Sequence, residues 1–188
     1  PIPAGWVNPD NADYAYNYEE WSPELQAEYS YDPERAKSLL EEAGYPNGFS
    51  FTVLVGSNED VSVLEILKAY FSAIGVEMSI DVQDPTTAQN LAAAKNYEAY
   101  WTKNTASGAI PATMVRMDYS TASTNYVQAN DPEFDALCDE LGAATTEDDI
   151  KRLCTACDQY VLEHHWGIRL FPTYVYNVSA SYLHGYSG

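Results

Sequence analysis

The stretch YDPERAKSLLEEAGYPNGFSFTVLVGSNEDVSVLEILKAYFSAIGVEMSIDVQ, residues 31–83, decides the fold that this sequence predicts. Asp32 and Pro33 are typical of a helix start, because an aspartate can accept from the free amides of the first turn and proline has no amide that needs a partner there. Apolar residues then recur at helical spacing until Gly44, which is typical of a helix end. The first element is therefore predicted to be a helix over residues 33–43.

A strand–helix–strand unit follows this helix. Apolar residues alternate along residues 49–55 and 76–83, which is the pattern of strands with one buried face. Between them, the apolar residues of 63–74 fall on one side of a helix, and Gly75 stops that helix. Two strands joined through a helix are typical of an α/β sheet.

The rest of the chain continues the alternation of helices and strands. We expect a helix over 85–94, a short strand over 97–102, a mixture of turns and a short helix over 114–129, a helix over about 131–141, a helix from Thr145 or Thr146 to about 164, and one or two strands over 168–178. Residues 1–30 are predicted to be an irregular lead-in that packs on residues 31–188, the lobe, by its aromatic residues. The predicted architecture is an α/β layered sandwich with a mixed sheet, formed by residues 31–188.

Composition and charge limit the classes of partner. The 188 residues include 28 acidic and 9 basic ones, for a net charge of −19. Nucleic acid and anionic membrane surfaces would repel such a chain. No apolar run is long enough to cross a bilayer, so direct membrane insertion is not expected. The charge favours a soluble exterior, with attraction of a cationic ligand as the alternative. The start at Pro1, without a signal peptide, suggests a piece of a longer precursor.

Cysteine and histidine residues offer a possible reactive or metal site. Cys138, Cys154 and Cys157 all fall in helical apolar patterns, so they are interpreted first as small core residues. A bridge from Cys138 to one of the other two is an alternative. Zinc binding is weaker still, because the local sequence lacks a fourth ligand. His164 and His165 adjoin a helix end, where a structural role is favoured. We therefore predict no metal and no cofactor.

The candidate ligand surface is the predicted strand end and loop that follow Tyr97. Ligands of open α/β sheets favour loops beyond the strand ends, where short polar side chains and an aromatic face can contact them. A solvated loop beside a core tryptophan is the alternative. The candidate ligand-binding residues are Trp101, Asn104, Thr105, Ser107, Arg116 and Tyr119.

Several segments resemble a known family. These are YDPERAKSLLEEAGYPNGF with the strand, the helix ending in AIGVE and the strand that follow it, then NDPEFDALCDEL with a long helix and IRLFPTYVY, and the opening PIPAGWVNPD. Together they resemble the extracellular solute-binding proteins of family 5, the dipeptide, oligopeptide and nickel receptors of ABC importers. The resemblance implies one lobe, the C-terminal one, of a type II periplasmic-binding-protein-like fold.

The resemblance also implies a function. The chain would be the lobe that closes over a peptide or similar small solute, with the N-terminal lobe of the same protein and a membrane permease as partners. Its location would be extracytoplasmic, in the periplasm or at the cell surface, with a signal peptide or lipid anchor on the full-length protein. In peptide-binding members a Trp and an Asp of this loop region contact the peptide, and the Asp holds its free amine. Their positions fall near Asn104 and Ser107, where this sequence has no carboxylate, and Arg116 could instead pair with a carboxylate or carbonyl group.

Two other classes of function stay open from the residues alone. A protein-interaction module without a transport role would use the tyrosine-rich first 30 residues, provided that they form an exposed apolar patch. A small enzyme would use Cys157 or His165. The sequence contains no GxSxG, HExxH, Walker or GxGxxG motif, so no enzymatic activity is predicted.

Overall fold

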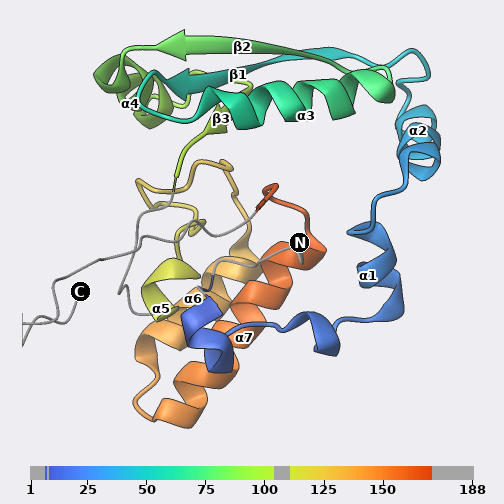
Figure 1. The fold of residues 1–188 in the computed structure, drawn as a ribbon. Coiled ribbons are helices and arrows are strands. Elements are labelled where there is room, and N and C mark those ends of the chain that lie inside the picture. The colour runs from blue at the N-terminus through green and yellow to red at the C-terminus, as the bar shows by residue number, and fades with distance from the viewer. Residues whose placement is uncertain (1–6, 8, 104–110, 171–188) are drawn as a thin grey trace, which may run out of the picture.

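The computed structural model describes residue 7, residues 9–103 and residues 111–170. Its elements are, in chain order, η1 (Pro9–Tyr14), η2 (Tyr18–Glu20), α1 (Pro23–Glu28), α2 (Pro33–Glu42), β1 (Ser50–Gly56), α3 (Val61–Ala73), β2 (Glu77–Gln83), α4 (Pro85–Ala93), β3 (Ala99–Trp101), α5 (Pro111–Met114), α6 (Pro132–Ala143) and α7 (Glu147–Glu163), where η marks a 3-10 helix. Figure 1 shows two parts, an α/β layer (β1, β2, β3, α3 and α4) and a helical group (η1, η2, α1, α5, α6 and α7), with α2 between them along one side.

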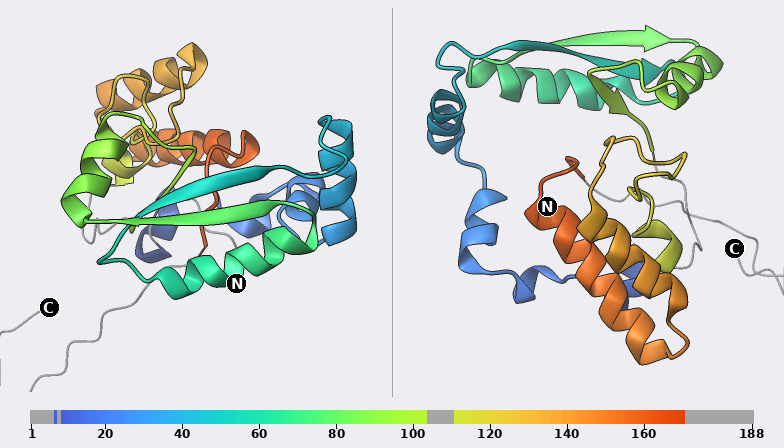
Figure 2. Two further views of the ribbon diagram at one scale, coloured as in Figure 1. Left: turned by 90° about the horizontal axis from the view of Figure 1, so that it is seen from above. Right: turned by 180° about the vertical axis from the view of Figure 1, so that it is seen from behind.

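The α/β layer is built around β1. The strand order is β2-β1-β3, and β1 pairs in parallel with both neighbours, Val53 opposite Ile80 on one side and Val55 opposite Trp101 on the other. Figure 2 shows α3 running along one face of these strands. The face toward α3 carries the small core of this layer, formed by Val53, Val55, Leu64 and Met78 with partly buried Phe51, Leu67, Phe71, Ile80, Ala99 and Trp101 around them. The predicted strand–helix–strand unit is therefore confirmed.

The predicted mixed sheet is not observed in the described residues. All three described strands run in parallel. A helix connects each strand to the next and brings the chain back to the end of the sheet where the previous strand began. Ile168–Leu170, where a last strand was predicted to begin, has no regular secondary structure. The rest of that predicted strand, 171–178, lies outside the described residues.

Two glycines bring the turns before β1 and β2 together. Gly48 has a φ of +71°, and a Cβ there would lie 1.8 Å from the carbonyl oxygen of Gly75. Gly75 itself has a φ of +86°. Only glycine combines this close backbone approach with a left-handed conformation at low cost. The turn and the helix end that the sequence predicted at these positions thus also align the two strands.

The helical group holds the larger core. Apolar side chains from η1, the segment after α5, α6 and α7 enclose it, and its buried residues are Val7, Val115, Phe134, Cys138, Leu141, Leu153, Cys154, Cys157 and Val161. Asp131 caps α6 by accepting from the amides of Glu133 and Phe134, and Thr146 caps α7 by accepting from the amide of Asp149. Both helix starts match the prediction within one residue.

The lead-in is more regular than predicted. Its described part forms two 3-10 helices and α1. The amide of Asn17 donates to the Glu20 carboxylate at the start of η2, and the Ser22 hydroxyl accepts from the amide of Leu25 at the start of α1. Trp21 is buried and packs with Tyr16, Tyr18, Tyr29, Leu25 and Leu162. Aromatic residues of the lead-in thus pack together at these positions, whereas Trp6 lies outside the described residues. The boundary between a lead-in over 1–30 and a lobe from residue 31 stays a prediction.

The apolar side of α2 is not buried, although the helix itself is where the sequence predicted it. Among the residues of α2 none is buried, and Leu39 keeps 46% of its surface exposed. The helix starts well, because Pro33 occupies its first turn and Asp32 accepts from the amide of Arg35 at 3.0 Å. Local start and stop signals are enough to define this helix, but they do not provide the surface that it would pack against.

Among the described residues, no helix is long and apolar enough to cross a membrane.

Candidate functional site

The carboxyl edge of β1 and β3 is the candidate site. The chain goes from β1 to β2 on one side and then returns past β1 to β3 on the other, so the strand order reverses between β1 and β3. In open α/β sheets such a reversal leaves room for a ligand outside the carboxyl ends of the two strands. Here the strands end at Gly56 and Trp101. The predicted candidate residues begin at this edge, with Trp101.

The turn after β1 forms one wall of this edge. A Cβ at Gly56 would lie 2.6 Å from Oδ1 of Asn58, so the Asn58 side chain packs closely over the end of β1. Asp60 then caps α3, and hydrogen bonds from the hydroxyl and amide of Ser62 lower the pKa of its carboxyl group. Lys103, which follows β3, lowers that pKa further. The positive charge of Lys103, after β3, therefore acts on the carboxylate of Asp60, after β1.

Two enclosed polar atoms at this edge lack hydrogen-bond partners. They are Nε1 of Trp101 and Oε2 of Glu59, and each is buried without a partner in the described part of the chain. One is a donor and the other an acceptor, and unpaired buried polar atoms of this kind are costly unless something else satisfies them. Trp101 was predicted to belong to the site, whereas Glu59 was not. The reversal at β1 could have pointed to it, because the loop after β1 must share the edge with the loop after β3.

Arg116 and Tyr119 lie in the helical group instead. The Arg116 guanidinium sits 5.9 Å from the Tyr119 ring centroid, and a Cβ at Gly142 in α6 would be 3.2 Å from its Nη1. A hydrogen bond with Asp139 raises the pKa of Tyr119. The structure thus brings Arg116 and Tyr119 together, but Tyr119 packs on the core of the helical group and Trp101 on that of the α/β layer. Asn104, Thr105 and Ser107 lie outside the described residues.

A hollow lies on the sheet face that α3 does not cover. Its volume is about 410 Å³, and Thr52, Leu54, Asp81, Leu91, Lys95, Asn96, Tyr97 and Glu98 line it. The Glu98 carboxylate accepts from the amide of Thr52 at 2.6 Å. This bond provides a partner for an amide of β1 one residue before the pairing with β3 starts, at Val53 and Ala99. Lys95 donates to the carbonyl of Asn125. The polar groups of this hollow therefore already hold the sheet and the loop before α6.

Two buried carboxylates lie close to a partly buried arginine that follows α7. The carboxyl groups of Asp118 and Asp158 are almost fully enclosed, and Nη2 of Arg169 lies 3.7 Å from Oδ2 of Asp118. Burial lowers the pKa of Arg169 to about 9, although both carboxylates oppose the shift. Asp158 also accepts from the amide of Tyr16 at 3.1 Å. Since breaking such buried pairs is costly, this network fixes the lead-in and the segment after α7 on the helical group.

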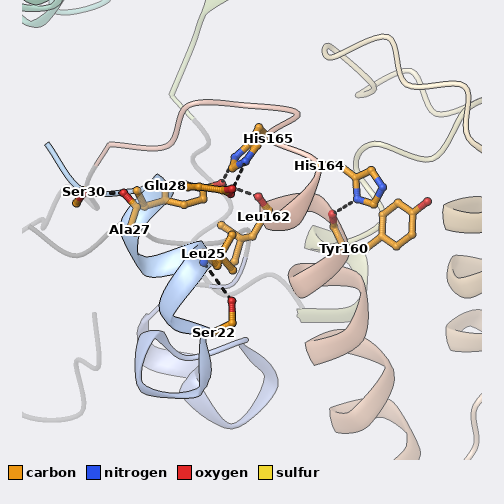
Figure 3. A network of polar contacts seen from close by, with 10 residues as sticks. Ser22, Leu25, Ala27, Glu28, Ser30, Tyr160, Leu162, His164 and His165 are labelled. Carbon is orange, nitrogen blue, oxygen red and sulfur yellow. Dashed lines mark hydrogen bonds and ion pairs between the residues drawn. The ribbon is translucent and has the colours of Figure 1, made fainter. Parts of the chain in front are cut away.

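His164 and His165 have structural partners (Figure 3). His164 is the C-cap of α7, and its Nδ1 lies 2.7 Å from the carbonyl oxygen of Tyr160. His165 Nε2 lies 3.1 Å from Oε2 of Glu28, and Nδ1 lies 3.3 Å from the hydroxyl of Tyr29. That hydroxyl in turn donates to the carbonyl of Leu162 at 2.8 Å. The predicted role at a helix end is confirmed, and in addition His165 joins α1 to α7.

The three thiols do not form a reactive site. All are fully buried, and burial raises the pKa of Cys154 to about 11. A hydrogen bond with Cys138 and burial also raise the pKa of Cys157. A protonated, enclosed thiol is a poor nucleophile. Within the described ranges, no group of three or more side chains that commonly bind metals is arranged around a common point.

Comparisons with known proteins agree on one family. The model of the bacterial extracellular solute-binding proteins, family 5 Middle, matches residues 3–126. The glutathione-binding protein GsiB of Escherichia coli (strain K12) is 34% identical over 84 residues, and that of Salmonella typhimurium is 37% identical over the same length. These 84 residues are 44% of this chain but only 15% of each relative, so the chain matches a small part of the whole protein.

Solved structures show the same fold. The periplasmic binding protein DppA from Helicobacter pylori, in complex with the peptide STSA, has a TM-score of 0.72 at 20% identity, covering 89% of this chain and 32% of that one. Haemophilus influenzae OppA in complex with RPPGFSPFR has a TM-score of 0.67 at 22% identity, with coverages of 89% and 34%. At these identities the likeness concerns the fold alone.

Proposed function

The chain belongs to family 5 of the bacterial extracellular solute-binding proteins, and on this premise we propose that it is the C-terminal lobe of the substrate-binding component of an ABC importer. The family is one of binding proteins and not of enzymes. The lobe would have a type II periplasmic-binding-protein-like fold and would close over a peptide or similar small solute. The observation that carries the proposal is the family match over residues 3–126. This range includes the whole α/β layer and the strand ends at Gly56 and Trp101 that form the candidate site.

The proposed mechanism is closure of two lobes around the solute. The N-terminal lobe of the same protein would supply the other half of the contacts, and the closed form would be presented to a membrane permease. Closure requires that the solute bind the closed state more tightly than the open one, because a ligand shifts an equilibrium only by its differential affinity. The protein would work outside the cytoplasm, in the periplasm or at the cell surface. The full-length chain would carry a signal peptide or a lipid anchor.

The proposed solute contacts come from the carboxyl edge of the sheet, the loop after it, and two residues of the helical group, Arg116 and Tyr119. Trp101, Asn104, Thr105, Ser107, Arg116 and Tyr119 are the proposed ligand-binding residues, and Glu59 joins them. Two relatives are named for binding glutathione, and two neighbours in fold were solved with peptides. A peptide-like solute is therefore the proposed class. Trp101 could donate to a solute carbonyl, and Glu59 could accept from a solute amide or amine.

A calorimetric titration with glutathione and a set of di- and tripeptides tests the residues. Arg116→Gln should weaken binding by about tenfold or more, because a hydrogen bond to a charged group contributes about 1.5–3 kcal/mol. Trp101→Phe keeps the aromatic ring and removes only the Nε1 donor, so a smaller loss is expected. Arg152→Gln is the matched control, since Arg152 is an exposed arginine that pairs with Glu140 and Asp149. Unchanged affinity in both variants, or binding at a surface away from these residues, would contradict the proposed site.

A protein-interaction surface is the second candidate. Ile66 and Tyr70 keep 58% and 56% of their surfaces exposed on the outer side of α3, and Tyr31 packs edge-on against Tyr70. Exposed apolar groups of this kind are typical of surfaces that another protein part covers. In a two-lobe receptor the remainder of the same protein could be that part. Cross-linking from a cysteine placed at Ile66 would distinguish a contact within one chain from a contact with a separate protein.

A further inference from the structure

The Arg116 guanidinium packs against the backbone of α6 at Gly142. A Cβ at Gly142 would lie 3.2, 3.5 and 3.6 Å from Nη1, Cζ and Nη2 of Arg116, so its three nearest neighbours all belong to one guanidinium. The shortest of these distances is closer than an ordinary van der Waals contact, and a side chain at Gly142 would displace the group. Arg116 thus occupies the space that the missing side chain leaves open.

The backbone of α6 does not itself require a glycine at this position. Gly142 lies inside the helix, one residue before its end at Ala143, and it has no positive φ. Alanine is the more favourable residue in a helix, because glycine loses more backbone freedom on folding. The contact with Arg116 is therefore what the absence of a side chain at Gly142 provides.

The charge of Arg116 has no counter-ion within the described ranges. Arg116 forms no ion pair there, although the chain has 28 acidic and 9 basic residues. Its Nε is enclosed without a hydrogen-bond partner in the same ranges, and its guanidinium lies 5.9 Å from the Tyr119 ring centroid. The amide of Tyr119 donates to the Arg116 carbonyl at 3.2 Å, which keeps the two residues on one turn. A guanidinium that is held but not paired suits a carboxylate, because its planar fork matches the two carboxylate oxygens.

We propose that Gly142 is a positioning residue, which holds Arg116 in place for a carboxylate of the solute and does not contact the solute itself. This inference rests on the proposed role of Arg116 in solute binding. It adds what sets the place of the arginine and which chemical group the arginine binds. A side chain that is already held loses less freedom on binding, so the contact with Gly142 should increase affinity.

The position of Arg116 is tested first without any solute, in this chain. The NMR signal of the Arg116 Nε–H group, assigned by its absence in Arg116→Gln, should shift in Gly142→Ala and exchange faster with water. The melting temperature should stay within about 4 °C of the original value, because the better helix residue offsets the lost contact. An unchanged Nε–H signal would overturn the proposal. A larger fall in melting temperature would also overturn it, because the glycine would then serve the fold and not the arginine.

Binding is then measured by calorimetry in the longer protein that contains this chain. The probes are glutathione and trialanine, each compared with a form whose C-terminal carboxylate is blocked, glutathione glycine ethyl ester and trialanine amide. Gly142→Ala should weaken binding of a free-carboxylate probe by about threefold or more, but should cause no further loss in the Arg116→Gln background, because its effect passes through the arginine. Blocking the carboxylate should weaken binding to the unaltered protein and have little effect on binding to Arg116→Gln.

Gly167→Ala is the matched control. A Cβ at Gly167 would lie 3.9 Å from Cγ1 of Val127, which is an ordinary contact, so neither the affinity nor the Arg116 signal should change. Equal weakening by Gly142→Ala with and without Arg116 would overturn the positioning role. Equal affinity of the unaltered protein for free and blocked probes would overturn the carboxylate. If the longer protein binds none of the probes, the proposed function fails, whereas the Arg116 signal still decides whether Gly142 positions the arginine.

Discussion

The α/β layer and the helical group bury their apolar residues differently. In the α/β layer, α3 covers one face of a three-stranded sheet, while Ile66, Tyr70 and Val82 stay exposed. In the helical group, α6, α7 and the lead-in close around a larger core that holds Phe134 and all three cysteines. The first part has the more regular apolar pattern in sequence, yet the second part has the more complete core. Periodicity therefore predicts which residues form an element, but not whether a partner covers each of its faces.

This difference fits a piece of a larger receptor. An apolar surface that stays exposed in one part is what remains when neighbouring chain is absent, whereas a core that is closed by its own helices needs no such neighbour. The chain matches 15% of the length of its GsiB relatives, so most of a homologous receptor would lie outside it. The α/β layer, which carries the candidate edge, is then the part expected to depend on the rest of the protein.

The largest effect is expected in the core of the helical group. Phe134 is fully buried and packs against Tyr160 and Trp166. Phe134→Ala should lower the free energy of unfolding by about 3–5 kcal/mol, the range for truncating a buried phenylalanine. Urea denaturation followed by circular dichroism measures this loss. A loss below that of a comparable truncation in the α/β layer would break the comparison.

A smaller loss is expected in the α/β layer. Leu64 is fully buried between α3 and the sheet, and Leu64→Ala should cost about 2–3 kcal/mol, at the lower end of the range for buried leucine because this core is open on one side. Ile66→Ala, two residues along the same helix, is the matched control and should change the stability by no more than about 0.5 kcal/mol. Equal losses in the two variants would mean that the outer side of α3 is covered in solution.

Acid should weaken the helical group through Asp131. Desolvation would raise the pKa of Asp131, but hydrogen bonds from the amides of Phe134 and Glu133 and from the hydroxyl of Tyr160 lower it below its ordinary 3.8. Its stabilising contribution is therefore complete above pH 3.8 and is lost as the pH falls through the lower, folded-state value. Asp131→Asn should reduce the melting temperature at pH 6 more than at pH 2. An identical reduction at both pH values would contradict the assignment.

The smallest effect is expected at the contact between α1 and α7. Glu28 and His165 are both partly exposed, and ion pairs of this type contribute about 0–1 kcal/mol. Glu28→Gln should therefore change the melting temperature only slightly, and 1 M salt should remove most of the difference. Glu24→Gln on the same helix is the control. A large loss in Glu28→Gln would mean that the attachment of α1 depends on this pair more than on the burial of Trp21 and Leu25.

Local signals in the sequence were enough to predict most elements of the fold. Capping by Asp131 and Thr146, and the glycines at 48 and 75, defined turns and helix starts that depend only on neighbouring residues. The parallel order of the sheet and the open side of α2 could not be predicted in this way. Both depend on which surfaces pack together. The charged groups of Asp118, Asp158 and Arg169 likewise join segments that are far apart in sequence.

The candidate site was predicted only in part. The edge after Trp101 follows from the position of β3, and the structure adds Glu59 because the loop after β1 shares that edge. Arg116 and Tyr119 were chosen by their place after the loop, and the structure brings them to each other and to α6. Sequence distance could not show this separation, because the segment with Arg116 and Tyr119 packs on the helical group.

The most direct test of the account is to compare solute binding by this chain alone with binding by the longer protein that contains it. One titration calorimetry series with the same peptides and glutathione is sufficient. We predict that the longer protein binds a member of the set and that the chain alone binds it at least about tenfold more weakly, because one lobe supplies only part of the contacts. Equal affinity in the two proteins would contradict the proposal that this chain is one lobe of a two-lobe receptor.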